Sequence, residues 1–201
     1  MNILDKIKQD ALANHVPILQ DTSMEFIELI LKIARPNSIL EIGSAVGYSA
    51  IKFSKYLCGK EPHIKTIELN KDMYKIATNN VCDMKLNEII EVINADATKY
   101  LYEMDEKKEQ FDVIFIDAAK GQYLIFLENA IRLAKDNAII IADNVLFKGR
   151  VLSEYSEHKH RTATNRLRQY LNQINENPLL MSYVLDIGDG IAISVVNKNL
   201  T

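Results

Sequence analysis

The stretch of residues 38–49 constrains the fold more than any other part of the chain. Residues 39–42 form the short apolar run that is typical of a parallel strand covered on both faces. Gly43 and Gly47 bracket a turn in which the backbone must bend sharply, and a helical pattern follows. A strand, a glycine-bearing turn and a helix in this order are typical of the first unit of a nucleotide-type site. The unusual member is Glu41, a carboxylate inside the apolar strand.

The rest of the chain repeats this alternation of apolar runs and helical patterns. Further parallel strands are predicted at residues 64–69, 90–94, 111–117 and 138–142. Helical periodicity is found over residues 3–13, 25–34, 49–57, 71–84, 100–104, 122–134 and 162–175. Strands alternating with helices predict an α/β fold with a parallel sheet and helices on both faces. Two last runs, residues 183–187 and 191–196, flank Gly188-Asp189-Gly190 and predict a C-terminal antiparallel hairpin.

Composition limits the class of protein. The length of 201 residues, with 48% hydrophobic and 25% charged residues, predicts one globular domain over residues 1–201. The formal net charge of −3 excludes a chain that is basic throughout and leaves room for a local basic patch. Cys58 and Cys82 lack metal-type spacing, which favours reduced thiols and a cytoplasmic protein. No apolar run approaches the roughly 20 residues that span a bilayer, so we expect no membrane contact.

A carboxylate or an amide stands at the end of every predicted parallel strand. These residues are Glu41, Glu68, Asp96, Asp117 and the pair Asp143 and Asn144. Ligands of such sheets bind outside the carboxyl ends of the strands. Each residue taken singly is explained as a helix cap or a loop residue. Five such ends together favour a binding site.

The first three strand ends favour a ligand with a nucleoside and no phosphate. A carboxylate in the position of Glu68 accepts hydrogen bonds from ribose hydroxyls, and Asp96 is placed to meet an adenine edge. The turn after Glu41 departs from the G-x-G-x-x-G pattern that cradles a pyrophosphate, and the carboxylate before it would repel one. S-adenosylmethionine, which carries a ribose, an adenine and a cationic sulfonium, suits this turn better than a dinucleotide does.

The last two strand ends offer only oxygen ligands. Asp117, Asp143 and Asn144 would select a hard cation such as Mg²⁺, Mn²⁺ or Ca²⁺. On these residues alone, a metal site and plain capping roles are equally open. Lys120 follows Asp117 at a helix start, where the helix dipole disfavours a cation. It is a candidate general base, or a charge that holds an anionic nucleophile.

One basic cluster is found near the C-terminus. It consists of His158, Lys159, His160, Arg161, Arg166 and Arg168. A solvated helix face and a surface for the phosphates of a large anionic substrate remain equally open explanations.

Taken together, these motifs resemble a known family. The Glu-x-Gly-x-x-x-Gly turn at residues 41–47, the Asp117-Ala118-Ala119-Lys120 run and Asp143-Asn144 are similar to those of the metal-dependent O-methyltransferases related to catechol and caffeoyl-CoA methyltransferases. Within that family the chain most resembles small bacterial members that methylate 5-hydroxyuridine at the tRNA wobble position. The resemblance implies a Rossmann-like class I methyltransferase fold with a seven-stranded, mostly parallel sheet. It also implies a homodimer.

The resemblance further implies a role for each matching residue. The residues expected to bind S-adenosylmethionine are Val16, Glu41, Gly43, Ser49, Glu68, Asp96, Ala97 and Asp117. The methionine part would lie against Glu41, Gly43 and Ser49, with Val16 near the sulfonium. The ribose would lie on Glu68, and the adenine on Asp96 and Ala97. Mg²⁺, or Mn²⁺ or Ca²⁺ in its place, would be held by Asp117, Asp143 and Asn144, with Lys120 and Asp117 as catalytic residues.

The leading functional prediction is therefore a Mg²⁺-dependent and S-adenosylmethionine-dependent O-methyltransferase that forms 5-methoxyuridine in tRNA. The basic cluster would then contact tRNA. The first alternative is methylation of a small catechol or a caffeoyl-CoA-type thioester, in which case the basic cluster is a solvated face. The second alternative is a non-catalytic module that binds an adenosine nucleotide, with the strand-end acids acting as caps.

Overall fold

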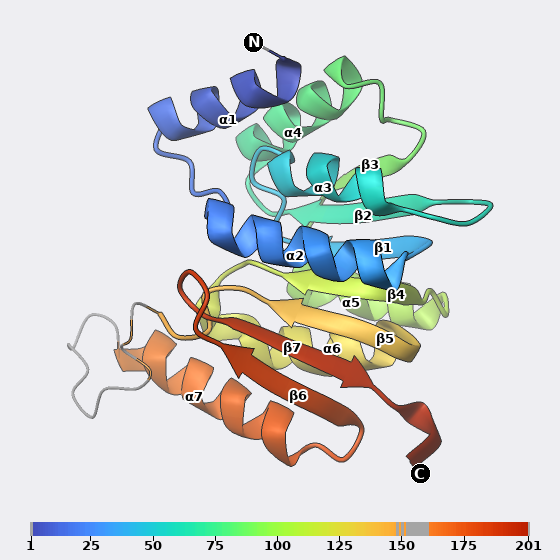
Figure 1. Cartoon of the computed structure of the whole chain (residues 1–201), viewed down its shortest axis with the longest axis vertical. Coiled ribbons are helices and arrows are strands. Elements are labelled where there is room, and N and C mark those ends of the chain that lie inside the picture. Colours follow the sequence, from blue (N-terminus) through green and yellow to red (C-terminus); the bar gives the residue numbers. More distant parts are fainter. Residues whose placement is uncertain (1, 148, 150, 152–160, 201) are drawn as a thin grey trace. The chain divides into compact units, whose positions relative to one another are not determined.

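Helices and strands alternate along the chain much as the apolar periodicity predicts (Figure 1). The computed structural model describes residues 2–147, 149, 151 and 161–200. Its chain forms two compact units, Met1–Ala97 (the first unit) and Thr98–Thr201 (the second unit). The expectation of a single domain over residues 1–201 stays a prediction.

The first unit is built on three parallel strands. They are β1 (Ser38–Ile42), β2 (His63–Glu68) and β3 (Ile90–Asn94), in the spatial order β3-β2-β1. The helices are α1 (Ile3–Ala13), α2 (Asp21–Ala34), α3 (Tyr48–Phe53), the 3₁₀ turn η1 (Ser54–Tyr56) and α4 (Lys71–Asp83). All five residues of β1 are buried, which explains why its sequence is a nearly unbroken apolar run.

The second unit carries one parallel and two antiparallel strand pairs. Its strands are β4 (Phe111–Ile116), β5 (Ala134–Ala142), β6 (Leu180–Leu185) and β7 (Ile191–Val196), in the order β4-β5-β7-β6. β4 and β5 are parallel, whereas β7 is antiparallel to both β5 and β6. The helices are α5 (Ala97–Glu106), which starts at the end of the first unit, the 3₁₀ turn η2 (Lys120–Gln122), α6 (Tyr123–Leu133), α7 (Arg161–Glu176) and the 3₁₀ turn η3 (Lys198–Leu200).

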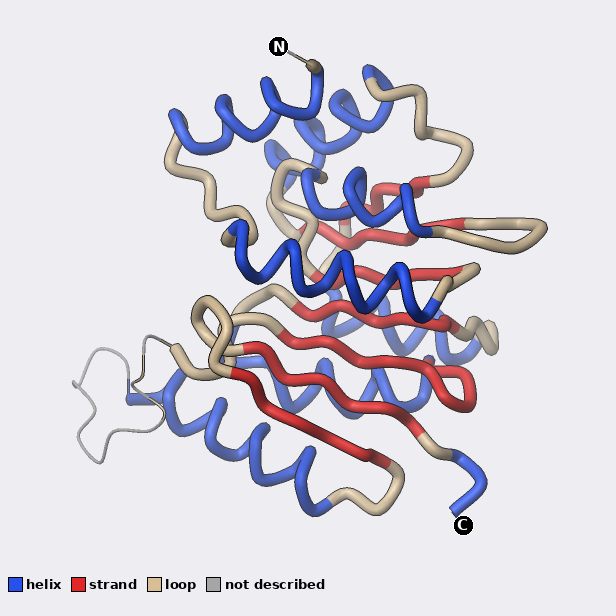
Figure 2. Tube along the Cα trace, in the orientation of Figure 1, coloured by secondary structure: helices blue, strands red, loops and turns tan. Residues whose placement is uncertain are grey.

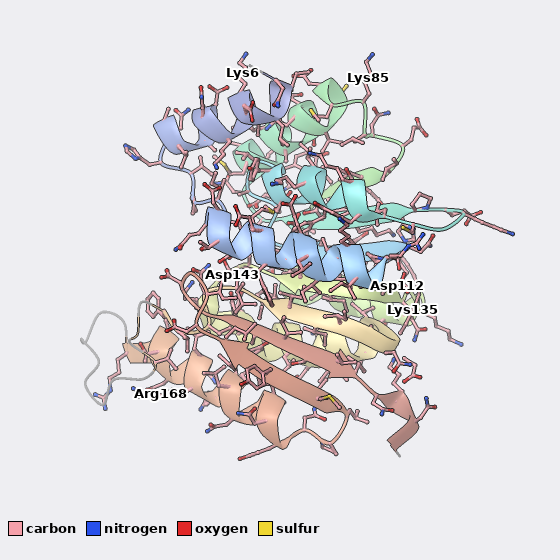
Figure 3. All side chains as sticks on the ribbon, viewed as in Figure 1. Lys6, Lys85, Asp112, Lys135, Asp143 and Arg168 are labelled. Carbon is pink, nitrogen blue, oxygen red and sulfur yellow. The ribbon has the colours of Figure 1, made fainter. Side chains whose placement is uncertain are left out.

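The two ends of the β4–β5 pair differ in chemistry. At the start of these strands, the Lys135 ammonium donates to the Asp112 carboxylate over 2.9 Å, an ordinary ion pair. At the opposite end lies Asp143, whose side chain is almost fully buried (Figure 3). Helices α6 and α7 pack on this sheet, α6 against β4 and β5 and α7 against β6 (Figure 1). A buried carboxylate without an ion-pair partner of this kind is unfavourable, so the carboxyl ends of β4 and β5 are the place to look for a ligand.

Several predicted boundaries are wrong by a few residues. Strand β5 starts at Ala134 instead of residue 138, because its register with β4 shifts between Phe111 and Val113 and so admits the polar residues 135–137. The first strand of the hairpin starts at Leu180 instead of residue 183, and helix α2 starts at Asp21 instead of residue 25. The predicted α/β class, the seven strands and the C-terminal antiparallel hairpin are confirmed in the parts of the chain described above.

Candidate functional site

The turn after β1 is held open by backbone geometry and by one carboxylate. Gly43, Ala45 and Gly47 all have positive φ, at 103°, 44° and 79°. Glu68, at the end of β2, accepts the Ala45 N–H over 2.8 Å on one oxygen and the Asn70 N–H over 2.7 Å on the other. A non-glycine residue in the left-handed region costs about 1 kcal/mol, so the bond to Glu68 offsets the strain at Ala45. Glu68 thereby fastens the turns after β1 and β2 together.

Two features of the structure require glycine at position 47. Its φ of 79° suits glycine, and a Cβ built on it would lie 3.3 Å from the Cβ of Ala77 in α4. Helix α4 also reaches the same turn through Asn80, whose amide donates to the Val46 carbonyl over 2.9 Å. The wide glycine spacing therefore reflects close packing of α4 on the turn.

Glu41 lies beneath this turn. Its side chain is fully buried, and its two oxygens accept hydrogen bonds of 2.5 Å from the Ser49 and Thr66 hydroxyls. In this position Glu41 joins β1 to β2 and to the first turn of α3. The expectation that Glu41 and Ser49 line a methionine moiety stays a prediction, and the structure adds that the two residues are one hydrogen-bonded unit. Thr66 was missed from the sequence because a threonine inside a strand carries no signal of its own.

Of the remaining predicted cofactor residues, Val16, Asp96 and Ala97 lie in the first unit, whereas Asp117 lies in the second, and its contact with the cofactor stays a prediction. Asp96 follows β3 and Ala97 begins α5, and both are half-buried. Val16, half-buried, lies between α1 and α2, where its N–H donates to the Ala11 carbonyl over 2.9 Å. The turn after β1 contributes Ser44, whose buried hydroxyl has no partner in the described part of the chain. A buried hydroxyl without a partner is costly, which marks Ser44 as a further candidate contact for a ligand.

In the second unit, Asp117, Asp143 and Asn144 come together as predicted. The Asn144 amide donates to the Asp143 carboxylate over 2.8 Å and to the Asp117 carboxylate over 3.4 Å. Within a regular strand, adjacent residues would face opposite ways. β5 has ended at Ala142, however, and Asn144 has a φ of 59°, which turns its side chain back toward Asp143. Asparagine is among the few residues that adopt this conformation readily.

This cluster concentrates unfavourable negative charge. Burial, and after it the neighbouring Asp117 carboxylate, raises the pKa of Asp143 from 3.8 to about 7. Burial also raises the pKa of Asp117, although Lys120 and the Asn144 amide oppose part of that rise. One oxygen of Asp143 (Oδ1) is buried without a hydrogen-bond partner among residues 2–147, 149, 151 and 161–200. A buried and a half-buried carboxylate with an unused oxygen on the buried one fit a bound cation.

The donor set is suited to a hard cation only if Asn144 takes part. Within the described residues, no three His, Cys, Asp or Glu side chains gather as a metal cluster. Asp117 and Asp143 supply two carboxylates. The amide nitrogen of Asn144 faces them in this structure, and its oxygen would become a third ligand when the amide turns over toward a cation. An all-oxygen set with few protein ligands is typical of Mg²⁺, which keeps several waters or substrate oxygens. These residues therefore fit the predicted metal.

Lys120 is placed to act beside these carboxylates. It opens the η2 turn and its positive charge lowers the pKa of Asp117. Its ammonium lies 5.3 Å from the centre of the Phe147 ring. A cation over an aromatic face is attracted to it, so Phe147 restrains the long lysine side chain. Phe147 is a site residue that the sequence did not indicate, because its contact with Lys120 depends on the loop after β5.

The hairpin turn between β6 and β7 supports the loop after β5 (Figure 2). The Val145 N–H donates to the Gly190 carbonyl over 3.0 Å, and the Leu146 N–H donates to the Asp189 carbonyl over 2.9 Å. Gly190 has a φ of 92°, and a Cβ built on it would lie 2.3 Å from Cγ of Leu146. Gly190 of the predicted hairpin is therefore needed for close contact with the loop that follows Asp143 and Asn144.

The structure separates the arginines of the basic cluster. His158, Lys159 and His160 lie outside the described residues. Arg161 and Arg166 are exposed on α7, and Arg166 donates to the Gln169 side chain over 3.2 Å. Arg168 donates its Nε–H to the Val151 carbonyl over 3.0 Å and so has a structural contact (labelled in Figure 3). Among the described arginines of this cluster, Arg161 and Arg166 remain the candidates for contact with an anionic substrate.

None of the helices in the described ranges is both long enough and apolar enough to cross a bilayer.

Comparison with known proteins agrees with this site. The profile of the O-methyltransferase family matches residues 1–197, so the chain belongs to that family. A catechol O-methyltransferase of Niastella koreensis is 29% identical over 175 residues, which cover 86% of this chain and 79% of the relative. A caffeoyl-CoA O-methyltransferase of Populus kitakamiensis is 28% identical over 177 residues, covering 84% and 73%.

Solved structures agree as well. An O-methyltransferase from Bacillus cereus, solved in complex with SAH, superposes with a TM-score of 0.87 and 28% identity, covering 97% of this chain and 90% of that one. A Staphylococcus aureus protein superposes with a TM-score of 0.88 and 28% identity, covering 98% and 93%. The predicted Rossmann-like methyltransferase fold and the predicted enzyme class, an S-adenosylmethionine-dependent O-methyltransferase, are confirmed.

Proposed function

We propose that this enzyme methylates one hydroxyl of a small acceptor that carries two adjacent oxygens, as catechols and caffeoyl-CoA-type thioesters do. The observation that carries the proposal is the group formed by Asp117, Asp143 and Asn144, with its unused Asp143 oxygen. Two adjacent oxygens of an acceptor chelate the kind of hard cation that this group fits. The named relatives, a catechol and a caffeoyl-CoA O-methyltransferase, support the same class of acceptor.

We assign the methyl donor, S-adenosylmethionine, to the first unit. Glu68 would hold the ribose, because each carboxylate oxygen keeps a lone pair beyond the bonds to Ala45 and Asn70. Gly43 and Ser49 would line the methionine part, and the unpartnered Ser44 hydroxyl lies in the same turn. The SAH bound to the Bacillus cereus relative supports this cofactor.

We assign the divalent cation, Mg²⁺ or its substitutes Mn²⁺ and Ca²⁺, to Asp117, Asp143 and Asn144. When bound there, it would lower the pKa of an acceptor hydroxyl and fix the direction of that hydroxyl. The chain's own contribution is to hold these three side chains together beyond the strand ends. Asp143 is held in a nearly solvent-free position, and Asn144 is turned back by its left-handed backbone.

Lys120 supplies the remaining charge. Methyl transfer from a sulfonium is an in-line displacement, so the acceptor oxygen must be held at the right distance and angle. Loss of the hydroxyl proton makes that oxygen a better nucleophile. Lys120, restrained over the ring of Phe147, would either accept the hydroxyl proton or hold the resulting oxyanion. Asp117 would fix the position of Lys120 through the attraction between their charges.

Methylation of 5-hydroxyuridine in tRNA stays a prediction. Its 4-carbonyl and 5-hydroxyl are also adjacent oxygens, so the same oxygen ligands would serve. Exposed Arg161 and Arg166 are available for phosphates. The two sequence relatives named above carry the names of catechol and caffeoyl-CoA methyltransferases, however, and Arg168 has a backbone partner. Family membership favours either enzyme over a non-catalytic nucleotide module. The homodimer and the cytoplasmic location also stay predictions.

An acceptor panel tests the proposal. The purified chain is mixed with methyl-labelled S-adenosylmethionine, Mg²⁺ and one of three acceptors: a catechol, caffeoyl-CoA, or tRNA that contains 5-hydroxyuridine. We expect label in a catechol-type acceptor. The matched variant replaces Arg161 and Arg166 by Gln, and we expect turnover of the small acceptor to be unchanged. Transfer to tRNA alone, lost in that variant, would overturn the small-acceptor proposal and favour tRNA.

A further inference from the structure

A buried tyrosine lies behind the acidic group and bonds to its backbone. Tyr123, the first residue of α6, is fully buried, and its hydroxyl donates to the carbonyl of Asp143 over 2.8 Å. Burial, and after it the charges of Asp117 and Asp143, raises the pKa of Tyr123 well above its usual range. The Tyr123 hydroxyl thus contacts the site through the backbone carbonyl of Asp143.

The hydrogen bond from Tyr123 affects the backbone conformation of Asn144. The Asp143 carbonyl belongs to the peptide group that joins Asp143 to Asn144. Rotation of that group changes φ of Asn144, which stands at 59° in the left-handed region. Asparagine adopts both the left-handed and the right-handed conformation, so contacts around this peptide group decide which of the two is held. The Asp143 carbonyl accepts a hydrogen bond from the Tyr123 hydroxyl. The left-handed conformation of Asn144 turns its side chain back toward the carboxylates.

The neighbouring backbone is fastened on both sides of the same peptide group. The Asp143 N–H donates to the Ile116 carbonyl over 3.0 Å, and the Val145 N–H donates to the Gly190 carbonyl over 3.0 Å. These bonds fix where the chain enters and leaves. The peptide group between Asp143 and Asn144 can still tilt between them, and the Tyr123 hydroxyl is the side-chain donor placed on its oxygen.

We propose that Tyr123 is a positioning residue, which orients the peptide group between Asp143 and Asn144 and thereby sets the oxygens of Asp117, Asp143 and Asn144 for a divalent cation. This inference rests on the cation site of the proposed function. Residues that orient metal ligands without touching the metal typically change metal affinity by about tenfold to a hundredfold when they are replaced.

The chain offers a closely matched control. Tyr170 of α7 is also fully buried, and its ring meets that of Tyr123 edge to face, with 5.6 Å between centroids and 78° between planes. Its hydroxyl, however, has no hydrogen-bond partner in the part of the chain that the structure describes. Tyr170→Phe and Tyr123→Phe each remove one buried oxygen from the same aromatic pair, and only the second removes a bond to the site.

The test measures cation binding without turnover. Mn²⁺ is titrated into the metal-free protein, and the free ion is followed by its electron paramagnetic resonance signal, for the wild type, Tyr123→Phe, Tyr170→Phe and Asp143→Asn. We expect Tyr123→Phe to weaken Mn²⁺ binding about tenfold and Tyr170→Phe to change it less than about twofold. Urea denaturation in EDTA reports in parallel whether each variant is folded.

The outcomes separate the two claims. If Asp143→Asn binds Mn²⁺ as the wild type does, the cation site itself is wrong. If Asp143→Asn abolishes binding while Tyr123→Phe and Tyr170→Phe bind equally, the cation site stands and the role of Tyr123 is refuted. A Tyr123→Phe variant that only loses stability, or does not fold, also counts against positioning and assigns the bond to the fold.

Discussion

Replacing Asp143 by asparagine should stabilise the metal-free protein while destroying its activity. Asp143 is 3% exposed, and its pKa is raised from 3.8 to about 7 by burial and by Asp117. Ionising it in the fold therefore costs about 4 kcal/mol, at about 1.4 kcal/mol per pH unit between these two values. Asparagine fills the same volume without a charge, so that cost disappears.

The sign of the pH dependence follows from the direction of the pKa change. Between about pH 4 and pH 7 the folded chain keeps a proton on Asp143 that the unfolded chain has released. The free energy of unfolding of the metal-free wild type therefore falls as the pH rises through this window. Above about pH 7 the contribution of Asp143 to that free energy no longer changes with pH. The stability gap between Asp143→Asn and the wild type should widen by about 3 kcal/mol from about pH 5 to about pH 8.

Urea denaturation in EDTA measures this gap. A change of this size moves the midpoint by roughly 1 M urea. The control is Asp186→Asn, which removes the same charge from an exposed carboxylate just after β6. An Asp143→Asn gap that stays constant from pH 5 to pH 8 would refute the argument that Asp143 is a buried, uncompensated carboxylate.

Three further substitutions test other parts of the site. Gly190→Ala should destabilise the chain by about 2 kcal/mol or more, because its Cβ would overlap Leu146, and thermal unfolding would show it. An unchanged unfolding temperature would contradict that contact. Glu68→Gln should weaken S-adenosylmethionine binding in calorimetry by about tenfold, since the charged acceptor of the Ala45 N–H is lost. Equal affinity would remove Glu68 from the cofactor site. Lys120→Met should lower kcat by about a hundredfold or more and leave Mn²⁺ binding intact, and an unaltered kcat would exclude Lys120 from catalysis.

The sequence predicts the parts of this molecule that depend on short-range pattern. The strand–turn–helix at residues 38–49 is confirmed, because a buried parallel strand requires an apolar run and the turn requires glycine. The grouping of Asp117 with Asp143 is confirmed as well. It follows from topology alone, since neighbouring parallel strands bring their carboxyl ends to one edge of the sheet.

Features that depend on contacts between distant segments could not be predicted. Glu41 was expected at a ligand, and its bonds to Thr66 and Ser49 emerge only when β1 and β2 pair. The early start of β5 requires a register shift against β4 that polar residues 135–137 give no reason to expect. In the sequence, Tyr123 is one of several residues on the apolar face of a predicted helix, and nothing singles it out. Its bond to Asp143 depends on where α6 packs.

The dependence of methyl transfer on a divalent cation tests the central claim most directly. Label transfer from S-adenosylmethionine to a catechol is measured with Mg²⁺, in excess EDTA, and after Mg²⁺ is restored, for the wild type and Asp143→Asn. We predict that transfer stops in EDTA, returns with Mg²⁺ in the wild type, and is absent throughout in Asp143→Asn although that variant is folded. Transfer that persists in EDTA, or an active Asp143→Asn variant, would contradict the assignment of a cation to Asp117, Asp143 and Asn144.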